Sequence, residues 1–140
     1  MTRATLRRAA VGAWLAAGAA LLPGTARAHD AADNVHTIMR QAVPEAPGKL
    51  AVVAIVDYAP RQASDAHRHL GSVFAVVSKG EVLSQVNDGP LHRYRTGEGW
   101  YEAPGSRHQV SRNASATEPA QLVVFGLTGA NVPLTSPIDQ

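Results

Sequence analysis

The sequence predicts an all-β domain built as a sandwich or a small barrel. Several short runs are rich in β-branched and other apolar residues, as in "LAVVAIVDY" at residues 50–58. Turn signals such as "NDGP", "TGEG" and "APGS" separate these runs. Short apolar runs separated by Gly, Pro, Asn and Asp are typical of strands joined by tight turns. The chain has 140 residues, which is enough for one ordinary domain.

The first 28 residues have the order of a secretory signal. A region with three arginines precedes an apolar run at residues 9–22, and a Pro-Gly break leads to "ARA" ending at Ala28. The run is shorter than the ~20 apolar residues of a membrane span. We therefore expect residues 1–28 to be a signal peptide cleaved after Ala28, a periplasmic or secreted location, and no stable membrane insertion after cleavage. An uncleaved membrane anchor is the alternative.

Charge and cysteine content exclude several classes of function. Removing the signal takes away four of 13 basic residues and leaves nine against 11 acidic ones. With no long basic run, the chain is not expected to bind nucleic acid or an anionic membrane. It has no cysteine, so disulfides, thiolate ligands and cysteine nucleophiles are excluded. An exported domain of this kind must be stabilised by core packing, a metal or oligomerisation.

The remaining chain divides into three parts. Residues 29–49 are predicted to be an N-terminal extension, in which 33–41 form either a helical turn or an edge strand. Residues 50–128 form the β domain, and the proline-containing tail 129–140 is either a strap across it or a frayed end. Within the β domain, strands are expected at 50–58, 73–77, 81–86 and 121–127.

The predicted strand at 73–77 is apolar on both faces. Val73, Ala75 and Val77 share one face, because side chains alternate along a strand. Phe74 and Val76 share the other face. A strand of this kind is usually covered on both sides. We expect a second sheet or another subunit to cover the outer side, and predict a homodimer formed through the outer sheet.

Three histidines form the candidate metal site. His67 and His69 are one residue apart in a predicted strand, so both rings should leave the same face. His108 follows a corner made by Pro104 and Gly105, which fixes its direction. Three converging imidazoles are most easily explained by a shared cation. The alternative is a metal-free pocket in which hydrogen bonds satisfy the rings.

Together these segments resemble the two motifs of the cupin superfamily. The first motif has His-x-His, a glutamate and a closing glycine, and the second has Gly, then Pro-x-Gly, two residues and His. The matching positions span roughly residues 50–127 and are His67, His69, Gly80, Gly97, Gly105 and His108. The resemblance implies a small double-sheet β-barrel of the jelly-roll type, with the three histidines facing one divalent metal in its mouth.

The main departure from the family pattern is at Val73, which stands where the motif has its glutamate. Glu102, just before the corner, is the candidate replacement as a fourth metal ligand. It can also be a solvated glutamate or a partner of Arg107. With fewer carboxylate ligands, the expected cofactor is one divalent transition metal, Fe, Zn, Ni or Cu rather than Mn.

The sequence leaves two classes of function open. The first is an exported mononuclear cupin enzyme that acts on a small organic substrate, dioxygenase-like in preference to isomerase- or decarboxylase-like. Glu102 and Tyr101 are its candidate catalytic residues, and Val73 and Trp100 its candidate pocket walls. The second is a non-catalytic module that binds or senses a metal or metabolite, because few positioned acids and bases accompany the histidines.

Overall fold

The computed structural model describes residues 34–138, so the predicted signal peptide and its cleavage site lie outside the described residues. The described chain is all-β, as predicted, and contains no helix. No helix in this part of the chain is therefore long and apolar enough to cross a membrane. The strands are β1 (Val35–Ala42), β2 (Lys49–Tyr58), β3 (Ala63–Ser64), β4 (His67–His69), β5 (Ser72–Lys79), β6 (Glu81–Val86), β7 (His92–Arg95), β8 (Gly99–Glu102), β9 (Arg107–Asn113), β10 (Ala120–Gly129) and β11 (Thr135–Pro137).

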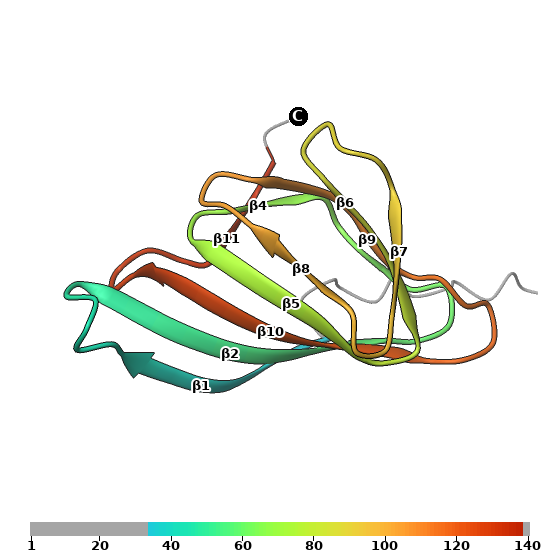
Figure 1. Ribbon diagram of the computed structural model, residues 1–140, viewed down its shortest axis with the longest axis horizontal. Helices are drawn as coiled ribbons and strands as arrows, with labels where there is room; N and C mark the ends of the chain where they lie inside the picture. Colours follow the sequence, from blue (N-terminus) through green and yellow to red (C-terminus); the bar gives the residue numbers. More distant parts are fainter. Residues whose placement is uncertain (1–33, 139–140) are drawn as a thin grey trace, which may run out of the picture.

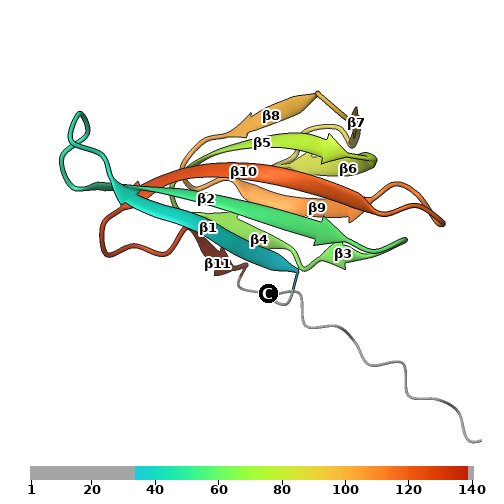
Figure 2. The same ribbon diagram turned by 90° about the horizontal axis from the view of Figure 1, so that it is seen from below.

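These strands form two antiparallel sheets that face each other (Figures 1 and 2). One sheet has the order β1-β2-β10-β5-β8. The other has the order β11-β4-β9-β6-β7, with β3 paired to β9. The expected double-sheet jelly roll is thus confirmed. The hydrogen bonding does not close the two sheets into a barrel.

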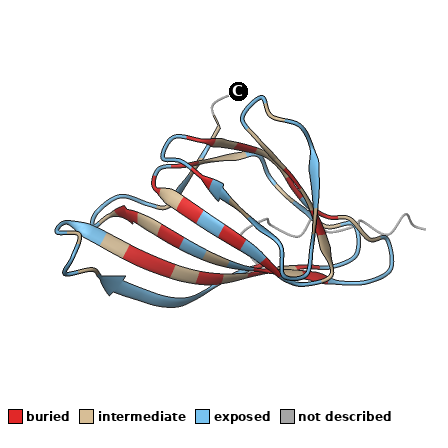
Figure 3. Cartoon of the chain, in the orientation of Figure 1, coloured by how far each residue is buried: buried red, intermediate tan, exposed pale blue. Residues whose placement is uncertain are grey.

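The core lies between the two sheets and follows the alternation of each strand. On β5, Val73, Ala75 and Val77 are buried and the residues between them are exposed, which gives the banded pattern of Figure 3. The buried cluster comprises Val56, Tyr58, Val77, Val82, Ala120 and Leu122. Period-two alternation between an apolar and a more exposed face is what a half-buried strand requires.

Residues 33–41 and the tail 129–140, for which the sequence allowed two structures each, both contribute edge strands to the sheets. Strand β1 pairs with β2, and every residue of β1 is exposed. Strand β11 pairs with β4, matching Thr135 with His69 and Pro137 with His67. The tail is therefore a strap that runs beside the histidine strand.

Leu134 anchors this strap. Its carbonyl oxygen accepts a hydrogen bond from the Leu70 amide at 2.9 Å. Its side chain occupies the space next to Gly126, where a Cβ atom would collide with it. Leu134 also lines the cavity between the sheets. Its packing links the tail to the central strand β10.

Replacing Leu134 with alanine is expected to lower the free energy of unfolding by about 1–2 kcal/mol, because the side chain is only partly buried. Chemical denaturation followed by circular dichroism measures this change. Val132→Ala, at an exposed position of the same segment, is the control and should have the smaller effect. Equal effects of the two variants would show that Leu134 does not anchor the strap.

Candidate metal centre

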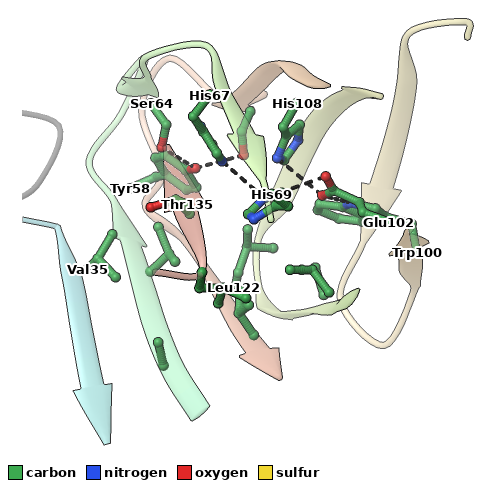
Figure 4. A pocket seen from close by; sticks show the side chains of 17 residues that line it. Val35, Tyr58, Ser64, His67, His69, Trp100, Glu102, His108, Leu122 and Thr135 are labelled. Atoms are coloured by element: carbon green, nitrogen blue, oxygen red, sulfur yellow. Dashed lines mark hydrogen bonds and ion pairs between the residues drawn. The ribbon is translucent and has the colours of Figure 1, made fainter. Parts of the chain in front are cut away.

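Strands β4 and β9 bring the three histidines together (Figure 4). His67 and His69 lie two residues apart on β4, and His67 is the register partner of His108 on β9. One ring nitrogen from each histidine lies within 4.8 Å of the others. The Nε2 atoms of His67 and His69 are 3.1 Å apart. The predicted convergence of the three rings is therefore present.

The corner before β9 holds the β4 strand in place. Gly105 adopts a φ of 87°, in the left-handed region that favours glycine. Its amide donates to the His69 carbonyl oxygen at 2.7 Å, and the His69 amide donates to the Ser106 carbonyl oxygen at 2.9 Å. The corner thus binds the backbone of one histidine while it directs the strand that carries another.

Glu102 points into the same site from β8. It is 1% exposed and is the register partner of Val73 on β5. Its Oε1 atom lies 3.3 Å from His108 Nδ1, and its Oε2 atom lies 3.5 Å from His69 Nε2. The alternative pairing with Arg107 does not occur, since that guanidinium contacts Asp88 at 3.0 Å. A carboxylate thus enters the site one strand away from the position where the family motif has it.

Trp100 orients the Glu102 carboxylate. Its indole Nε1 donates to Glu102 Oε1 at 2.9 Å. No hydrogen-bond partner is present for Glu102 Oε2, which is buried. The two side chains share a face of β8, because they are two residues apart. Trp100 therefore holds one carboxylate oxygen beside His108, and the other oxygen lies beside His69.

Burial controls the charges of the site. Desolvation raises the pKa of Glu102 to about 7, partly offset by the bond from Trp100. It lowers the pKa of His69 to about 4 and that of His108 to about 3, with the neighbouring imidazoles adding to the effect. In the protein without metal, these two rings are neutral at pH 7. Neutral imidazole is the form that binds metals.

Further contacts orient the rings. His67 Nδ1 donates to the Asp65 carbonyl oxygen at 2.7 Å, which leaves the lone pair on Nε2. His108 Nε2 lies 2.9 Å from the Ser84 hydroxyl oxygen. The sequence pattern did not identify Ser84, because only the pairing of β6 with β9 brings it to this ring. Such outer contacts fix the orientation of metal-binding histidines.

The histidines open into a cavity of about 110 Å³ between the sheets. Its walls are mainly apolar, and Val73 and Trp100 are among them. A hydroxyl cluster also lines it, in which the Tyr58 oxygen lies 2.8 Å from both Ser64 Oγ and Ser111 Oγ. Burial raises the pKa of Tyr58, so its hydroxyl stays protonated. These hydroxyls were not predicted, because Ser111 is distant in sequence from Tyr58 and Ser64 and joins them only through the pairing of β3 with β9.

Tyr101, a candidate catalytic residue, lies on the outer face of β8. Its neighbours Trp100 and Glu102 line the cavity, so alternation along β8 turns Tyr101 to the outer face. It is 52% exposed, its ring centroid lies 4.9 Å from that of Phe74, and its hydroxyl is 3.3 Å from Ser72 Oγ. The Tyr101 side chain is therefore not among those that line the cavity.

The three histidines are compatible with a metal ion. One ring nitrogen of each already converges with the others, and the Glu102 carboxylate lies beside two of the rings. Two buried polar atoms of this site, His69 Nδ1 and Glu102 Oε2, have no hydrogen-bond partner. A buried carboxylate next to neutral rings is costly without a cation. The three-histidine cluster is therefore compatible with a bound metal ion.

These features define a double-sheet β protein with a histidine-lined pocket between its sheets. A sequence model of the cupin domain matches residues 54–126, which is more than half of the chain. The chain belongs to the cupin superfamily. No curated protein matches it at the level of sequence.

Solved structures agree with this fold. A cupin-like protein from Thermotoga maritima superposes with a TM-score of 0.60 and 16% identity, over 76% of this chain and 75% of that one. A DMSP lyase from Ruegeria pomeroyi has a TM-score of 0.59 and 16% identity, over 74% and 50% of the two chains. An oxalate oxidase in complex with glycolate superposes with a TM-score of 0.56 and 23% identity, over 74% of this chain and 55% of that one. The chain spans about half the length of these enzymes, and such identities establish the fold alone.

Proposed function

We propose that this protein binds one divalent transition metal through His67, His69 and His108 and acts as an enzyme on a small organic substrate. Glu102 serves as a fourth ligand or as an acid or base beside the metal. The observation that carries the proposal is the buried Glu102 carboxylate, which faces the histidines from the strand next to Val73.

The chain's own residues support this chemistry. A bound divalent metal supplies a Lewis acid for a substrate oxygen atom. Without metal, the pKa of Glu102 is about 7, so its Oε2 atom can hold or release a proton near neutral pH. Trp100 keeps the other oxygen in place. The apolar part of the cavity wall, including Val73, favours a substrate that is partly apolar.

The structural neighbours are compatible with an enzyme of this type. They include a DMSP lyase and an oxalate oxidase, which differ in reaction class. The shared fold therefore does not select one reaction. A dioxygenase-like reaction remains our first choice for this chain, because an imidazole-rich site suits iron, nickel or copper.

A non-catalytic metal- or metabolite-binding module is the second candidate. One observation favours it: Glu102 is the single carboxylate among the residues that line the cavity. Glu98, the acidic residue nearest to Glu102 in the sequence, is exposed and accepts a hydrogen bond from the Arg95 amide at 2.7 Å. Catalysis usually needs a positioned acid or base besides the metal ligands.

Elemental analysis tests the metal site. Protein purified without added metal, or reloaded after chelation, is expected to hold about one equivalent of a transition metal, as for sites with three protein nitrogen ligands. His69→Ala should lose most of it, because His69 lies centrally between His67 and Glu102. His92→Ala is the control, since His92 is exposed on β7 and should keep the metal. Metal content near zero in the reloaded parent protein would contradict the proposal.

Turnover assays separate the two candidates. Metal-loaded parent protein is screened with phenolic and diketone compounds, together with His69→Ala. Turnover that disappears in the variant supports an enzyme. Saturable binding of a compound without turnover supports the binding module.

A further inference from the structure

The hydroxyl cluster of Tyr58, Ser64 and Ser111 lies at one end of the cavity. The Tyr58 hydroxyl oxygen is 2.8 Å from Ser64 Oγ and 2.8 Å from Ser111 Oγ, and all three side chains line the cavity. Figure 4 shows Tyr58 and Ser64 on one side of the histidines, and Glu102 and Trp100 on the other side. The cavity therefore has a second polar end, separate from the Glu102 carboxylate.

A β-bulge on β9 turns both Ser111 and His108 toward the cavity. The two residues are three positions apart, so a regular strand would direct them to opposite faces. The pairing of β9 with β6 changes register at this point: Val86 pairs with His108, whereas the preceding Gln85 pairs with Val110. The extra residue in β9 resets the alternation. His108 and Ser111 are consequently both buried, and both line the cavity.

The hydroxyl cluster has one more proton than its internal hydrogen bonds use. Burial raises the pKa of Tyr58, so three hydroxyl groups carry three protons, and the two internal contacts take up two of them. Within residues 34–138, the three oxygens have no other hydrogen-bond partner. Tyr58 is 2% and Ser111 4% exposed, and a buried donor without an acceptor is costly. In every arrangement of the two bonds, one O–H group is left to donate to a molecule in the cavity.

The cavity wall selects a neutral acceptor for this proton. Among the described residues that line the cavity, none is a lysine or an arginine. A carboxylate or phosphate at the hydroxyl cluster would therefore be buried without a cation beside it, which is costly. A carbonyl, ether or hydroxyl oxygen accepts the hydrogen bond without this cost. A ligand that displaces water from the cluster must offer such an oxygen or lose affinity.

The wall that faces the histidines from the opposite sheet is apolar. It is formed by the inner face of β2, β10 and β5, where the register pairs Val56 with Leu122, and Val124 with both Ala54 and Ala75. These side chains offer no hydrogen bond. The part of a ligand that lies against them is therefore apolar.

We propose that the hydroxyl cluster binds a neutral oxygen acceptor, such as a carbonyl group, of the molecule that occupies the cavity. Together with the proposed metal function, on which this second step rests, the cluster defines the substrate class. The substrate is a small compound with a metal-binding oxygen at one end, an apolar middle and a neutral oxygen acceptor at the other end. The cavity of about 110 Å³ is small beside the roughly 300–1,000 Å³ of pockets for drug-sized ligands, so this compound is short. A dicarboxylate, charged at both ends, does not meet this description.

Binding of cyclopentanone to the metal-free protein tests the hydroxyl cluster by itself. The parent protein and the hydroxyl-free variant Tyr58→Phe/Ser64→Ala/Ser111→Ala are kept with a chelator and titrated by NMR with cyclopentanone and with cyclopentane, which lacks the oxygen. The variant should bind cyclopentanone about 3- to 10-fold more weakly, because one hydrogen bond is lost. It should bind cyclopentane at least as tightly as the parent does. Removing all three hydroxyls leaves none of them unpaired, so the variant is expected to fold.

Thr128→Val is the control for the loss of a buried hydroxyl. Thr128 is 1% exposed, its hydroxyl donates to the Val132 carbonyl oxygen at 3.2 Å, and it is not among the residues that line the cavity. This variant should bind both compounds as the parent does. Equal affinity of the parent and the hydroxyl-free variant for cyclopentanone, or no binding to the parent up to the solubility limit, would overturn the proposal. An equal loss of affinity for cyclopentane would also overturn it, because that result indicates a change in packing.

Two hydroxamic acids test the substrate class in the metal-loaded protein. Both bind a metal through the hydroxamate group, but levulinohydroxamic acid ends in a methyl ketone and valerohydroxamic acid has the same chain without the ketone oxygen. The preference of the parent for the ketone should fall about 3- to 10-fold in the hydroxyl-free variant. Metal content is measured in parallel. An unchanged preference would show that the cluster and the metal do not bind two ends of one ligand. If neither acid binds while cyclopentanone behaves as expected, the metal function and the substrate class fail, but the hydroxyl cluster does not.

Discussion

Combining Val73→Glu with Glu102→Val is expected to restore much of the metal affinity that Glu102→Val alone removes. The two positions are register partners on β5 and β8, and both side chains are buried, Val73 and Glu102 each being 1% exposed. Directly paired residues of an antiparallel sheet have Cβ atoms about 5 Å apart. Exchanging them moves the carboxylate by one strand and keeps the composition of the site unchanged.

The size of each effect follows from the contacts of Glu102. Glu102→Val removes the carboxylate that lies next to both His69 and His108, and should weaken metal binding about 10- to 100-fold. The exchanged protein should recover to within about tenfold of the parent. Full recovery is not expected, because the Trp100 indole loses its acceptor at Glu102 Oε1.

Competition between the protein and a chromophoric chelator for zinc measures these affinities. Glu118→Val is the matched control, since Glu118 is exposed in the turn before β10 and should leave the affinity unchanged. If Glu102→Val binds zinc as tightly as the parent protein, Glu102 is not a ligand and the three histidines are sufficient. If the exchanged protein stays as weak as Glu102→Val, position 73 does not direct a side chain at the metal.

The sequence predicted the parts of this site that depend on local order. Alternation placed His67 and His69 on one face, and the Pro-Gly corner predicted a fixed direction for His108. The direction of Glu102 could not be predicted from the sequence. The corner between β8 and β9 breaks the alternation of faces, so positions on β9 do not determine which face of β8 a side chain leaves. The pairing of Glu102 with Val73 is a contact between strands far apart in sequence. Only the assembled sheet shows that the carboxylate stands on β8, next to the β5 position where the family motif has its glutamate.

The outward direction of Tyr101 and the contact of Ser84 with His108 could not be predicted from the sequence, for the same reason. Tyr101 follows Trp100 directly, so one of the two had to face outward, and the sequence did not decide which. Ser84 is one of many serines until β6 pairs with β9 and sets it 2.9 Å from the His108 ring. Polar side chains in such pockets are identified by tertiary pairing, whereas strands are identified by local alternation.

Burial of Glu102, His69 and His108 makes the stability of the metal-free protein depend on pH. The pKa of Glu102 is about 7 in the folded chain, above its ordinary 4.5. The folded state therefore binds this proton more tightly than the unfolded state does. The contribution of Glu102 to the free energy of unfolding is present below pH 4.5, is lost as the pH rises through 7, and stays lost above pH 7. The pKa values of His69 and His108, about 4 and 3, have the opposite consequence, since stability is lost as the pH falls below 6.5.

Glu102→Gln should therefore stabilise the metal-free protein at pH 8, by up to about 3 kcal/mol in the free energy of unfolding. A neutral amide avoids the cost of burying an unpaired charge. The gain should shrink toward zero near pH 4.5, and the histidines do not alter this difference because both proteins retain them. Denaturant titrations in the presence of a chelator, at pH 5 and pH 8, measure it.

Metal should reverse the sign of this change. A dication stabilises the ionised carboxylate, so that the loaded parent protein should be more stable than loaded Glu102→Gln at pH 8. Glu118→Gln, at an exposed position, controls for the loss of one negative charge and should change neither comparison by more than about half a kcal/mol. Equal stability of parent and Glu102→Gln without metal would show that the carboxylate is solvated or paired. A stabilising effect that persists with metal would show that Glu102 does not contact it.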